Sequence, residues 1–345
     1  MKLFSIASFT KEGNELAGLA EQALSGKYEI SRYQKDLQLW CGKQFEAHAA
    51  CILFIGAAGI AVRTIAPFLK DKMTDPAVVV ADEAGRYVIP ILSGHMGGAN
   101  EWAVYLAGLF GAEPVITTGT DVRNLFAADV FARKNHLIPG NPKTVKRISS
   151  ALLSGIKAGI WSEIPLEGTM PEELFPVCAD TPQSAEEACS GPLIVITERP
   201  YPVKDPGRVL SLFPKAFVIG IGCRKGKTLQ ELEDAVTVSL EKAGIVKDQI
   251  CGLASIDLKK EEPGLLELAK ALRVPFETYG AEVLEKTEGS VSSSDFVKKI
   301  TGTDSVCERA ALAMAGSGGF LVLPKQAGNG ITCAAAEKNW SVGFE

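Results

Sequence analysis

The sequence predicts a multi-domain α/β protein whose first domain is Rossmann-like and built from βαβ units. Short apolar runs alternate with amphipathic ones at both ends of the chain, and a less regular stretch separates them. A chain of 345 residues also exceeds what one hydrophobic core usually serves. We therefore expect an N-terminal α/β domain over 1–135, a small α/β middle domain with a linker over 136–214, and a separate C-terminal α/β domain over 215–345.

The first domain is predicted from its apolar runs and their spacing. The expected strands are 3–9, 28–33, 51–55, 77–81, 86–92 and one that begins at 114–118, and the expected helices are 16–24, 60–69 and 99–110. The strand at 77–81 is rich in valine and should be buried. Its hairpin partner should be an edge strand, because Pro90 cannot donate to a sheet ladder.

The middle of the chain shows weaker periodicity, with a helix near 145–153 and strands near 156–161 and 193–197. A proline-rich run at 200–207 is typical of a linker. An α/β pattern resumes at Ala216. The expected strands there are 216–221, 252–256, 274–278 and 320–323, and the expected helices are 229–243, 265–272 and 307–315.

Composition excludes several classes of function. A formal net charge of -5 argues against general affinity for nucleic acid or anionic lipid, since both need a broad basic surface. No apolar run is long enough to span a membrane, and the first residues lack a signal-peptide pattern. The 8 cysteines include no CxxC pair, which favours reduced thiols in the cytoplasm. With 3 histidines and no HExxH motif, we expect no metal site built by the protein itself.

The first candidate site is the run Ser93-Gly94-His95-Met96-Gly97-Gly98-Ala99-Asn100, between a predicted strand and a predicted helix. Open α/β sheets bind ligands at such places. Glycines let the backbone approach a ligand, N–H groups of the first helical turn can hold an anion, and a histidine can move a proton near neutral pH. Spacing alone does not separate this interpretation from one in which the glycines shape a turn and His95 hydrogen-bonds locally.

A second cluster, Gly56-Ala57-Ala58-Gly59, has the same position between a strand and a helix. The helix carries Arg63, whose guanidinium could clamp a carboxylate with two hydrogen bonds. The simpler alternative is that Arg63 is one more solvated arginine.

Two acidic residues of the first domain could serve either a site or a turn. The run Thr117-Thr118-Gly119-Thr120-Asp121 lies at the end of a predicted strand, where its hydroxyls and carboxylate could face the same crevice. The spacing of Asp121 fits an N-cap of the next helix better. Glu83 lies in the predicted hairpin turn, where a solvated carboxylate is the simpler interpretation.

The run Gly220-Ile221-Gly222-Cys223-Arg224-Lys225-Gly226-Lys227-Thr228 places three positive charges and several backbone donors between a strand and a helix. Its glycines do not fit the GxGxxG pattern of dinucleotide sites, because the third comes one position later. Anion binding and an ordinary loop both remain open. Cys223 could be an activated thiolate beside Arg224, but a lone cysteine most often packs in a core.

Motifs at both ends of the chain carry a resemblance to a known family. The N-terminal motifs are 52–69, 75–80, 92–100 and 115–121, and the C-terminal motifs are 220–226, 253–257 with Lys259 and Glu262, 305–312, and Pro324-Lys325. In these runs, and in their order, the chain resembles the CbiG family, the cobalt-precorrin-5A hydrolases. Met96 and Gly119 depart from otherwise matching runs, and no motif matches between about 136 and 214.

The resemblance implies a reaction of anaerobic cobalamin biosynthesis. The lactone of cobalt-precorrin-5A would be opened and acetaldehyde released, giving cobalt-precorrin-5B. The cobalt would arrive with the substrate, and no organic cofactor would be needed because the electrons released can spread into the tetrapyrrole. The resemblance also implies neighbouring methyltransferases of the pathway as partners.

The resemblance also implies roles for the candidate residues. His95 is expected as the general base, Gly97 and Gly98 as oxyanion donors, Ser93 as a nearby hydrogen-bonding group, and Asp121 or Glu83 as the residue that orients the imidazole. The residues expected to bind the substrate are Gly56, Gly59, Arg63, Gly97, Gly98, Asn100, Thr118, Gly222, Arg224, Lys225 and Lys227.

Two other classes of function stay open at this point. A noncatalytic carrier or scaffold for tetrapyrrole intermediates would use the same glycine-lined crevice and basic anchors without turnover. A nucleotide-binding oxidoreductase is the second alternative, although the glycine spacing after the strand at 216–221 fits it poorly.

Overall fold

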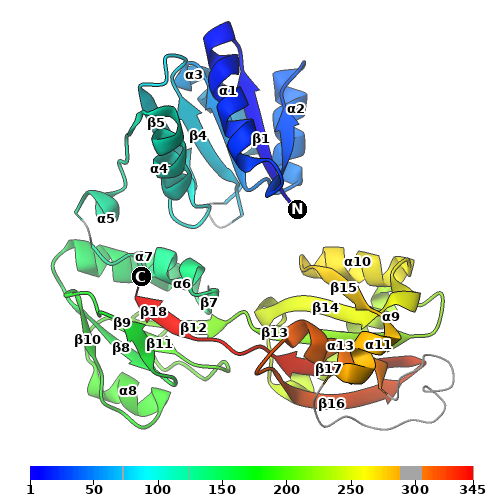
Figure 1. Ribbon diagram of the computed structural model, residues 1–345. Helices are drawn as coiled ribbons and strands as arrows, with labels where there is room; N and C mark the ends of the chain where they lie inside the picture. The colour runs from blue at the N-terminus through cyan, green and yellow to red at the C-terminus, as the bar shows by residue number, and fades with distance from the viewer. Residues whose placement is uncertain (72–73, 124, 288–304, 345) are drawn as a thin grey trace. The chain divides into compact units, whose positions relative to one another are not determined.

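The computed structural model describes residues 1–71, 74–123, 125–287 and 305–344. The chain forms two compact units, Met1–Val130 and Phe131–Glu345. Each combines helices with strands (Figure 1), so the chain is a multi-domain α/β protein, as the sequence predicts. The predicted limits of three domains stay a prediction.

The first unit is built around a sheet with the strand order β2-β1-β3-β4-β5-β6. Its elements are β1 (Lys2–Ser8), α1 (Lys11–Leu24), β2 (Tyr28–Arg32), α2 (Leu37–Glu46), β3 (Cys51–Ile55), α3 (Ala58–Ile65), η1 (Ala66–Phe68), β4 (Ala77–Ala81), β5 (Tyr87–Leu92), α4 (Ala99–Phe110), β6 (Glu113–Pro114) and α5 (Gly119–Val122). Strands β1 to β4 are parallel, whereas β5 runs antiparallel to β4. Because β6 pairs only with Tyr87 and Val88, β5 is an edge strand at Pro90 but not at its start.

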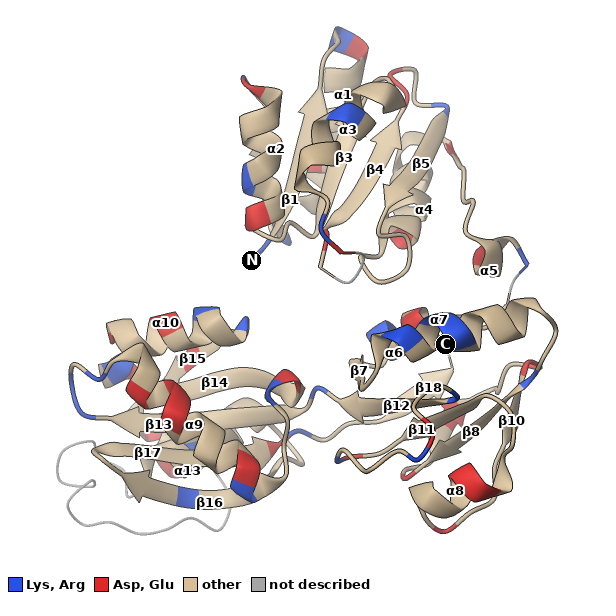
Figure 2. Cartoon of the chain, turned by 180° about the vertical axis from the view of Figure 1, so that it is seen from behind, with Lys and Arg blue, Asp and Glu red and all other residues tan. Residues whose placement is uncertain are grey.

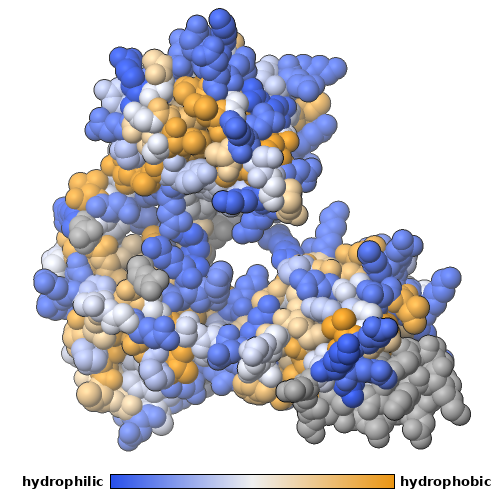
Figure 3. All heavy atoms as spheres, in the orientation of Figure 1, coloured by the Kyte–Doolittle hydropathy of each residue, from blue (hydrophilic) through white to orange (hydrophobic). Residues whose placement is uncertain are grey.

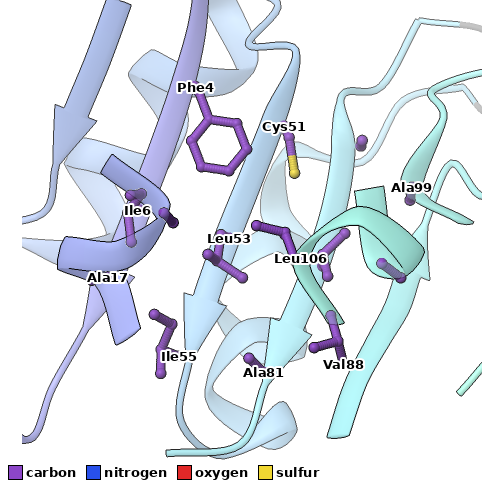
Figure 4. Packing of buried hydrophobic residues seen from close by; sticks show 14 of the residues in the cluster. Phe4, Ile6, Ala17, Cys51, Leu53, Ile55, Ala81, Val88, Ala99 and Leu106 are labelled. Atoms are coloured by element: carbon purple, nitrogen blue, oxygen red, sulfur yellow. The ribbon is translucent and has the colours of Figure 1, made fainter. Parts of the chain in front are cut away.

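Two hydrophobic layers cover the faces of this sheet. Phe4 and Ile6 of β1 and Leu53 of β3 pack beneath α1 and α4 (Figure 4). The alternate residues of the same strands, such as Ala7 and Phe54, pack on the other face with α2 and α3. Successive side chains of a strand point to opposite faces, so a strand buried on both faces is continuously apolar.

The direction of β5 places the candidate residues of this unit at opposite edges of the sheet. Gly56 follows the carboxyl end of β3, and Glu83 follows that of β4. The loop 93–98 follows β5, which runs the other way, so it lies beside the start of β4. There Ser93 Oγ donates to the backbone carbonyl of Asp75 at 3.0 Å. The whole length of β4 separates Glu83 from this loop, and the prediction that Glu83 could orient His95 is wrong.

The second unit contains two five-stranded sheets. The first has the order β10-β8-β11-β12-β7 and follows α6 (Ala128–Lys134), a helix that crosses the boundary between the units. The elements of this part are β7 (Leu137–Pro139), α7 (Pro142–Leu153), β8 (Ala158–Ser162), β9 (Leu166–Gly168), β10 (Leu174–Pro176), α8 (Pro182–Ala188), β11 (Leu193–Ile196) and β12 (Val209–Pro214). The end of the chain returns here, because β18 (Val342–Phe344) pairs with β9.

The other sheet of this unit has the order β15-β14-β13-β17-β16, with β13, β14 and β15 parallel. Its elements are β13 (Phe217–Cys223), α9 (Leu229–Ala243), η2 (Lys247–Gln249), β14 (Ile250–Ile256), η3 (Asp257–Lys259), α10 (Pro263–Leu272), β15 (Phe276–Tyr279), α11 (Ala281–Lys286), α13 (Val306–Ala315), β16 (Phe320–Gly328) and β17 (Ile331–Glu337). Gly220 lets α13 pack closely on β13, since an added Cβ would overlap the carbonyl oxygen of Cys307.

On the face of the molecule drawn in Figure 3, hydrophobic residues lie among charged and polar ones, which is usual for a globular protein. Within the residues that the structure describes, we find no helix of the length and apolar character that crossing a membrane requires.

Candidate active site

His95 is clamped between two carboxylates of the first unit. Its Nε2 lies 2.6 Å from Asp121 Oδ2, and its Nδ1 lies 3.1 Å from Asp129 Oδ1. Thr120 Oγ1 is a third neighbour, 3.3 Å from Nε2. The side chain of His95 is only 12% exposed. Both ring nitrogens therefore have an anionic partner in a largely enclosed place.

This clamp stabilises the charged form of the imidazole. The hydrogen bond to Asp129 raises the pKa of His95 most, burial opposes the rise, and the hydrogen bond to Asp121 adds to it, so that the pKa reaches about 9. At neutral pH the ring is therefore an imidazolium. A group that already holds its proton cannot serve as a general base, so the geometry favours a proton donor or a fixed positive charge over the predicted base.

The loop that carries His95 is closed by its own backbone hydrogen bonds. The N–H groups of Gly98, Ala99 and Asn100 donate to the carbonyls of His95, Ser93 and Gly94 at 3.0, 3.1 and 3.0 Å. The N–H of Gly98 is thus occupied, which argues against its predicted role as an oxyanion donor.

The tight path of this loop depends on Ser93 and Gly97. Ser93 adopts a φ of 56°, and its hydroxyl is used in the bond to Asp75. A Cβ on Gly97 would overlap the Ser93 side chain and lie 2.9 Å from the Ser93 carbonyl oxygen. Both residues therefore shape the turn that presents His95, which is a structural role rather than the chemical ones predicted from the sequence.

Asn100 connects the start of α4 to α5. Its Nδ2 donates to Thr118 Oγ1 at 2.9 Å and to Asp121 Oδ2 at 3.0 Å. Thr118 is the N-cap residue of α5, and Asp121 lies inside this short helix. The interpretation of Asp121 as an N-cap is therefore wrong, and Asn100, Thr118 and Asp121 lie together beside His95.

A pocket of about 490 Å³ adjoins this cluster. Its lining residues are Asn100, Glu101, Val104, Tyr105, Ile116, Asp121 and Val122. The pocket has mainly apolar walls, with Asn100, Glu101 and Asp121 as its polar members. Asp121 belongs both to the clamp and to the pocket, and its side chain is 38% exposed, so a bound molecule could reach it.

Asp129 is the residue of this site that the sequence interpretation missed. Asp129 lies at the start of α6, 34 residues after His95, and no motif connects the two. Thr120 belongs to the run 117–121, whose hydroxyls are predicted to face the crevice, and its hydroxyl lies beside His95. Only the path of the chain through α5 brings Asp129 to the imidazole, so no spacing could have indicated it.

The structure does not bring the second predicted cluster to His95. Gly56 has a φ of 148° and packs near Phe9, at the opposite edge of the sheet. Gly59 has no atom within 4 Å of an added Cβ, and Arg63 is exposed on α3. These three residues, predicted to bind the substrate, are therefore not part of the clamped site.

The loop between β13 and α9 carries three basic residues, and Lys and Arg are drawn blue in Figure 2. Its residues contribute to two different pockets. Gly222 and Arg224 line a pocket of about 500 Å³. Lys227 lines a different pocket and lies 2.6 Å from Glu231 Oε1, while Lys225 is exposed and lines neither. The four residues predicted as one set of anchors thus do not form one site. Burial raises the pKa of the Cys223 thiol, which makes an activated thiolate unfavourable there.

Within residues 1–71, 74–123, 125–287 and 305–344, no group of three or more His, Cys, Asp or Glu side chains could hold a metal ion.

Comparison with known families matches three successive parts of the chain. The models are described as Cobalamin synthesis G N-terminal over residues 40–121, Cobalamin biosynthesis central region over 126–214 and Cobalamin synthesis G C-terminus over 217–336. The central region is the part for which the sequence motifs gave no match.

Two relatives share most of their length with this chain. Cobalt-precorrin-5A hydrolase of Salmonella typhimurium is 40% identical over 265 residues, which cover 75% of this chain and 74% of that protein. Cobalt-precorrin-5A hydrolase of Priestia megaterium is 32% identical over 350 residues, covering 94% and 92%. Among solved structures, a cobalamin biosynthesis protein G homologue from Sulfolobus solfataricus is 23% identical, with a TM-score of 0.43 over 98% of this chain and 97% of the other.

Proposed function

This chain belongs to the CbiG family, and on that premise we propose that it is a cobalt-precorrin-5A hydrolase of cobalamin biosynthesis. The reaction opens the lactone of the substrate and releases acetaldehyde, giving cobalt-precorrin-5B. The observation that carries the proposal beyond the family is the His95 clamp, which reaches an adjoining pocket through Asp121.

We assign proton transfer to Asp121 and a fixed positive charge to His95. The hydrogen bond from Asn100 and the contact with His95 both use Oδ2 of Asp121, so among the described residues Oδ1 is left to face a substrate. Asp121 accepts a proton from the water that attacks the lactone carbonyl. The positive charge of the His95 imidazolium stabilises the negative charge that develops on the attacked carbonyl oxygen. Asp121 then returns the proton to the ring oxygen that leaves when the lactone opens.

The second step breaks a carbon-carbon bond. Asp121 removes the proton of the hydroxyl freed by lactone opening, the C–O bond becomes a carbonyl, and the adjacent carbon-carbon bond breaks. The fragment leaves as acetaldehyde, and the electron pair enters the conjugated macrocycle, where a proton is taken up. No oxidant or reductant is consumed, which is consistent with hydrolysis.

The cofactor and partner assignments belong to the same proposal. The cobalt is part of the substrate, and the chain needs no organic cofactor because the macrocycle accepts the released electrons. Neighbouring methyltransferases of the pathway are the proposed partners, and the cytoplasm, which keeps thiols reduced, is the proposed location. A purified, substrate-free protein with stoichiometric metal that activity requires would contradict the cofactor assignment.

The experiment is incubation of the intact chain with cobalt-precorrin-5A, followed by detection of acetaldehyde and of cobalt-precorrin-5B by mass. Release of acetaldehyde in proportion to product supports the hydrolase. Tight binding of the substrate without either product would instead identify a carrier. Binding of a nicotinamide nucleotide, measured by calorimetry, would favour an oxidoreductase.

A further inference from the structure

The pocket of about 500 Å³ at the carboxyl end of β13 is formed by segments far apart in the sequence. Its lining residues are Gly222, Cys223, Arg224, Ile256, Lys259, Val306, Cys307, Lys325, Ala327, Gly328, Asn329, Gly330, Ile331 and Thr332. They come from the end of β13, from β14 and η3, from the start of α13 and from the hairpin between β16 and β17. This pocket and the His95 clamp lie in different units of the chain.

The described lining of this pocket combines apolar walls with positive charges only. Ile256, Val306 and Ile331 are among its apolar walls, and it is rimmed by three cations, Arg224, Lys259 and Lys325. No acidic residue belongs to the described lining. Lys259 Nζ is neutralised by Glu262 Oε2 at 2.8 Å. In the ranges of the chain that the structure covers, the side chains of Arg224 and Lys325 have no ion-pair partner, so two positive charges remain for a ligand.

Arg224 is held in place by its own loop and by the hairpin opposite. Its N–H donates to the carbonyl of Gly330 at 2.9 Å. Gly330 has a φ of 74°, and a Cβ there would lie 2.9 Å from Arg224 Cδ, so glycine leaves the path of the arginine stem clear. Glu262 fixes the same loop, because its Oε1 accepts a hydrogen bond from the N–H of Gly226 at 2.7 Å.

Lys325 is fixed by a buried carboxylate. Glu308, which is 1% exposed, accepts a hydrogen bond from the Lys325 N–H at 2.9 Å and another from Ser305 Oγ at 2.5 Å. This contact falls where the pairing of β16 with β17 shifts register between Leu323 and Gln326. The carboxylate therefore replaces a ladder partner and fixes the backbone from which the lysine extends. A site positioned in this way loses little conformational entropy on binding.

We propose that this pocket binds one edge of an apolar ring that carries carboxylate side chains, with Arg224 and Lys325 as the anchors. A guanidinium matches a carboxylate with two hydrogen bonds, and an ammonium adds a point charge. The identity of the ring rests on the proposed function: it is the cobalt tetrapyrrole, whose acetate and propionate groups supply the anions. A corrin-sized macrocycle is larger than the pocket, so one edge enters. Of the basic residues predicted as anchors, this proposal keeps Arg224, and it adds Lys325 in place of Lys225 and Lys227.

The test titrates cobyrinic acid, a cobalt corrin with free carboxylates, into the full-length protein and measures the dissociation constant by calorimetry. Lys325→Gln and Arg224→Gln should each weaken binding about tenfold or more, because each removes a charged hydrogen bond. Lys225→Gln, which removes a neighbouring charge outside the pocket, should change it by less than about twofold. The fully esterified corrin should bind more weakly and be indifferent to all three changes.

The proposal is overturned if Lys325→Gln and Lys225→Gln bind cobyrinic acid equally, or if the wild-type protein binds the free acid no better than the ester. Thermal melting of each variant checks that it is folded. The measurement is separable from the proposed function. If the intact chain releases acetaldehyde and the variants bind cobyrinic acid as the wild type does, the pocket proposal is rejected and the hydrolase proposal stands. If the two pocket variants lose binding and the intact chain shows no turnover, the hydrolase proposal is rejected and the pocket proposal stands.

Discussion

The charge of His95 follows from the two carboxylates that hold it. Asp129 is almost enclosed, whereas Asp121 reaches the pocket, so the two partners of one imidazole have different access to a substrate. We infer that Asp129 keeps the ring charged and oriented, as a positioning residue, and that Asp121 exchanges protons with the bound molecule. The sequence indicated His95 and Asp121 but not Asp129. It did not indicate the protonation state of His95, because that state depends on a carboxylate with no motif of its own.

Asp129→Asn should lower the pKa of His95, because the hydrogen bond to Asp129 is the largest cause of its elevation to about 9. If activity requires the imidazolium, the wild-type rate should fall as pH rises through about 9, and the variant should lose activity at a lower pH. The pH profile of kcat gives the pH at which the wild-type protein and the variant each lose activity. Glu83→Gln, an exposed turn residue at the other sheet edge, is the control and should keep the wild-type profile; a shared shift in both variants would count against the clamp.

The same elevated pKa should make the stability contribution of His95 depend on pH. The folded protein holds the proton more tightly than the unfolded chain, so the contribution is complete below the ordinary pKa of 6.5 and is lost as pH rises through about 9. His95→Gln should therefore lower the melting temperature more at pH ~6 than at pH ~10. Equal losses at both pH values would show that the ion pairs add nothing to stability.

Among the helices and strands, the first sheet shows what periodicity can predict. The runs at 51–55 and 77–81 coincide with β3 and β4, because strands buried on both faces are apolar throughout. The strand expected from 114 ends at Pro114, since only Glu113 and Pro114 find partners on β5. Short elements such as α5, β9 and β18 have too few residues for a period, and β9 and β18 exist because they pair with each other across the chain.

Two glycine substitutions should separate a glycine required by the fold from one that is not. Gly97→Ala should reduce the free energy of unfolding by about 2 kcal/mol or more, because its Cβ would overlap Ser93 in a loop that cannot widen. Gly59→Ala meets no atom within 4 Å and lies in α3, so it should be neutral or stabilise by up to about 1 kcal/mol. Urea denaturation of both variants measures the difference. A neutral Gly97→Ala would mean that the loop is more adaptable than its hydrogen bonds indicate.

For the chain as a whole, the two sheets of the second unit meet at a buried carboxyl group. Glu337, which is 2% exposed, ends β17 and accepts a hydrogen bond from Trp340 Nε1 at 2.8 Å, just before the chain returns to β9. Arg199 Nη2 lies 3.8 Å from its Oε2 and 3.0 Å from Glu198 Oε1. Burial raises the pKa of Glu337 most, and the neighbouring Glu198 adds to the rise, from the ordinary 4.5 to about 7.

Glu337 should therefore destabilise the protein at alkaline pH. Because its folded pKa lies above the unfolded one, the folded state binds the extra proton between pH 4.5 and about 7, and stability falls as pH rises through that window. Glu337→Gln should raise the melting temperature at pH ~8 and have a smaller effect at pH ~5. Glu241→Gln, at an exposed position of α9, should show no such pH dependence. A variant that is destabilised equally at both pH values would indicate that the charged form is well paired.

The sequence motifs contain most residues of the candidate site, but they do not show which of these residues lie together in the fold. The motifs contained His95, Asn100, Thr118 and Asp121, which the fold brings together, and they also contained Gly56 and Arg63, which it places at the opposite edge. The antiparallel direction of β5 decides that separation. The predicted hairpin of 77–81 with 86–92 already implies this direction, but the grouping of the motifs into one site did not follow it.

The most direct measurement is acetaldehyde release from cobalt-precorrin-5A by the intact chain and by His95→Gln under matched conditions. We predict release by the intact protein and a loss of about 10²-fold or more in the variant, with substrate binding retained. His48→Asn is the control, because His48 is an exposed histidine at a φ of 48° that asparagine tolerates, and it should release acetaldehyde at the wild-type rate. Release by His95→Gln at the wild-type rate would contradict a catalytic clamp in the first unit.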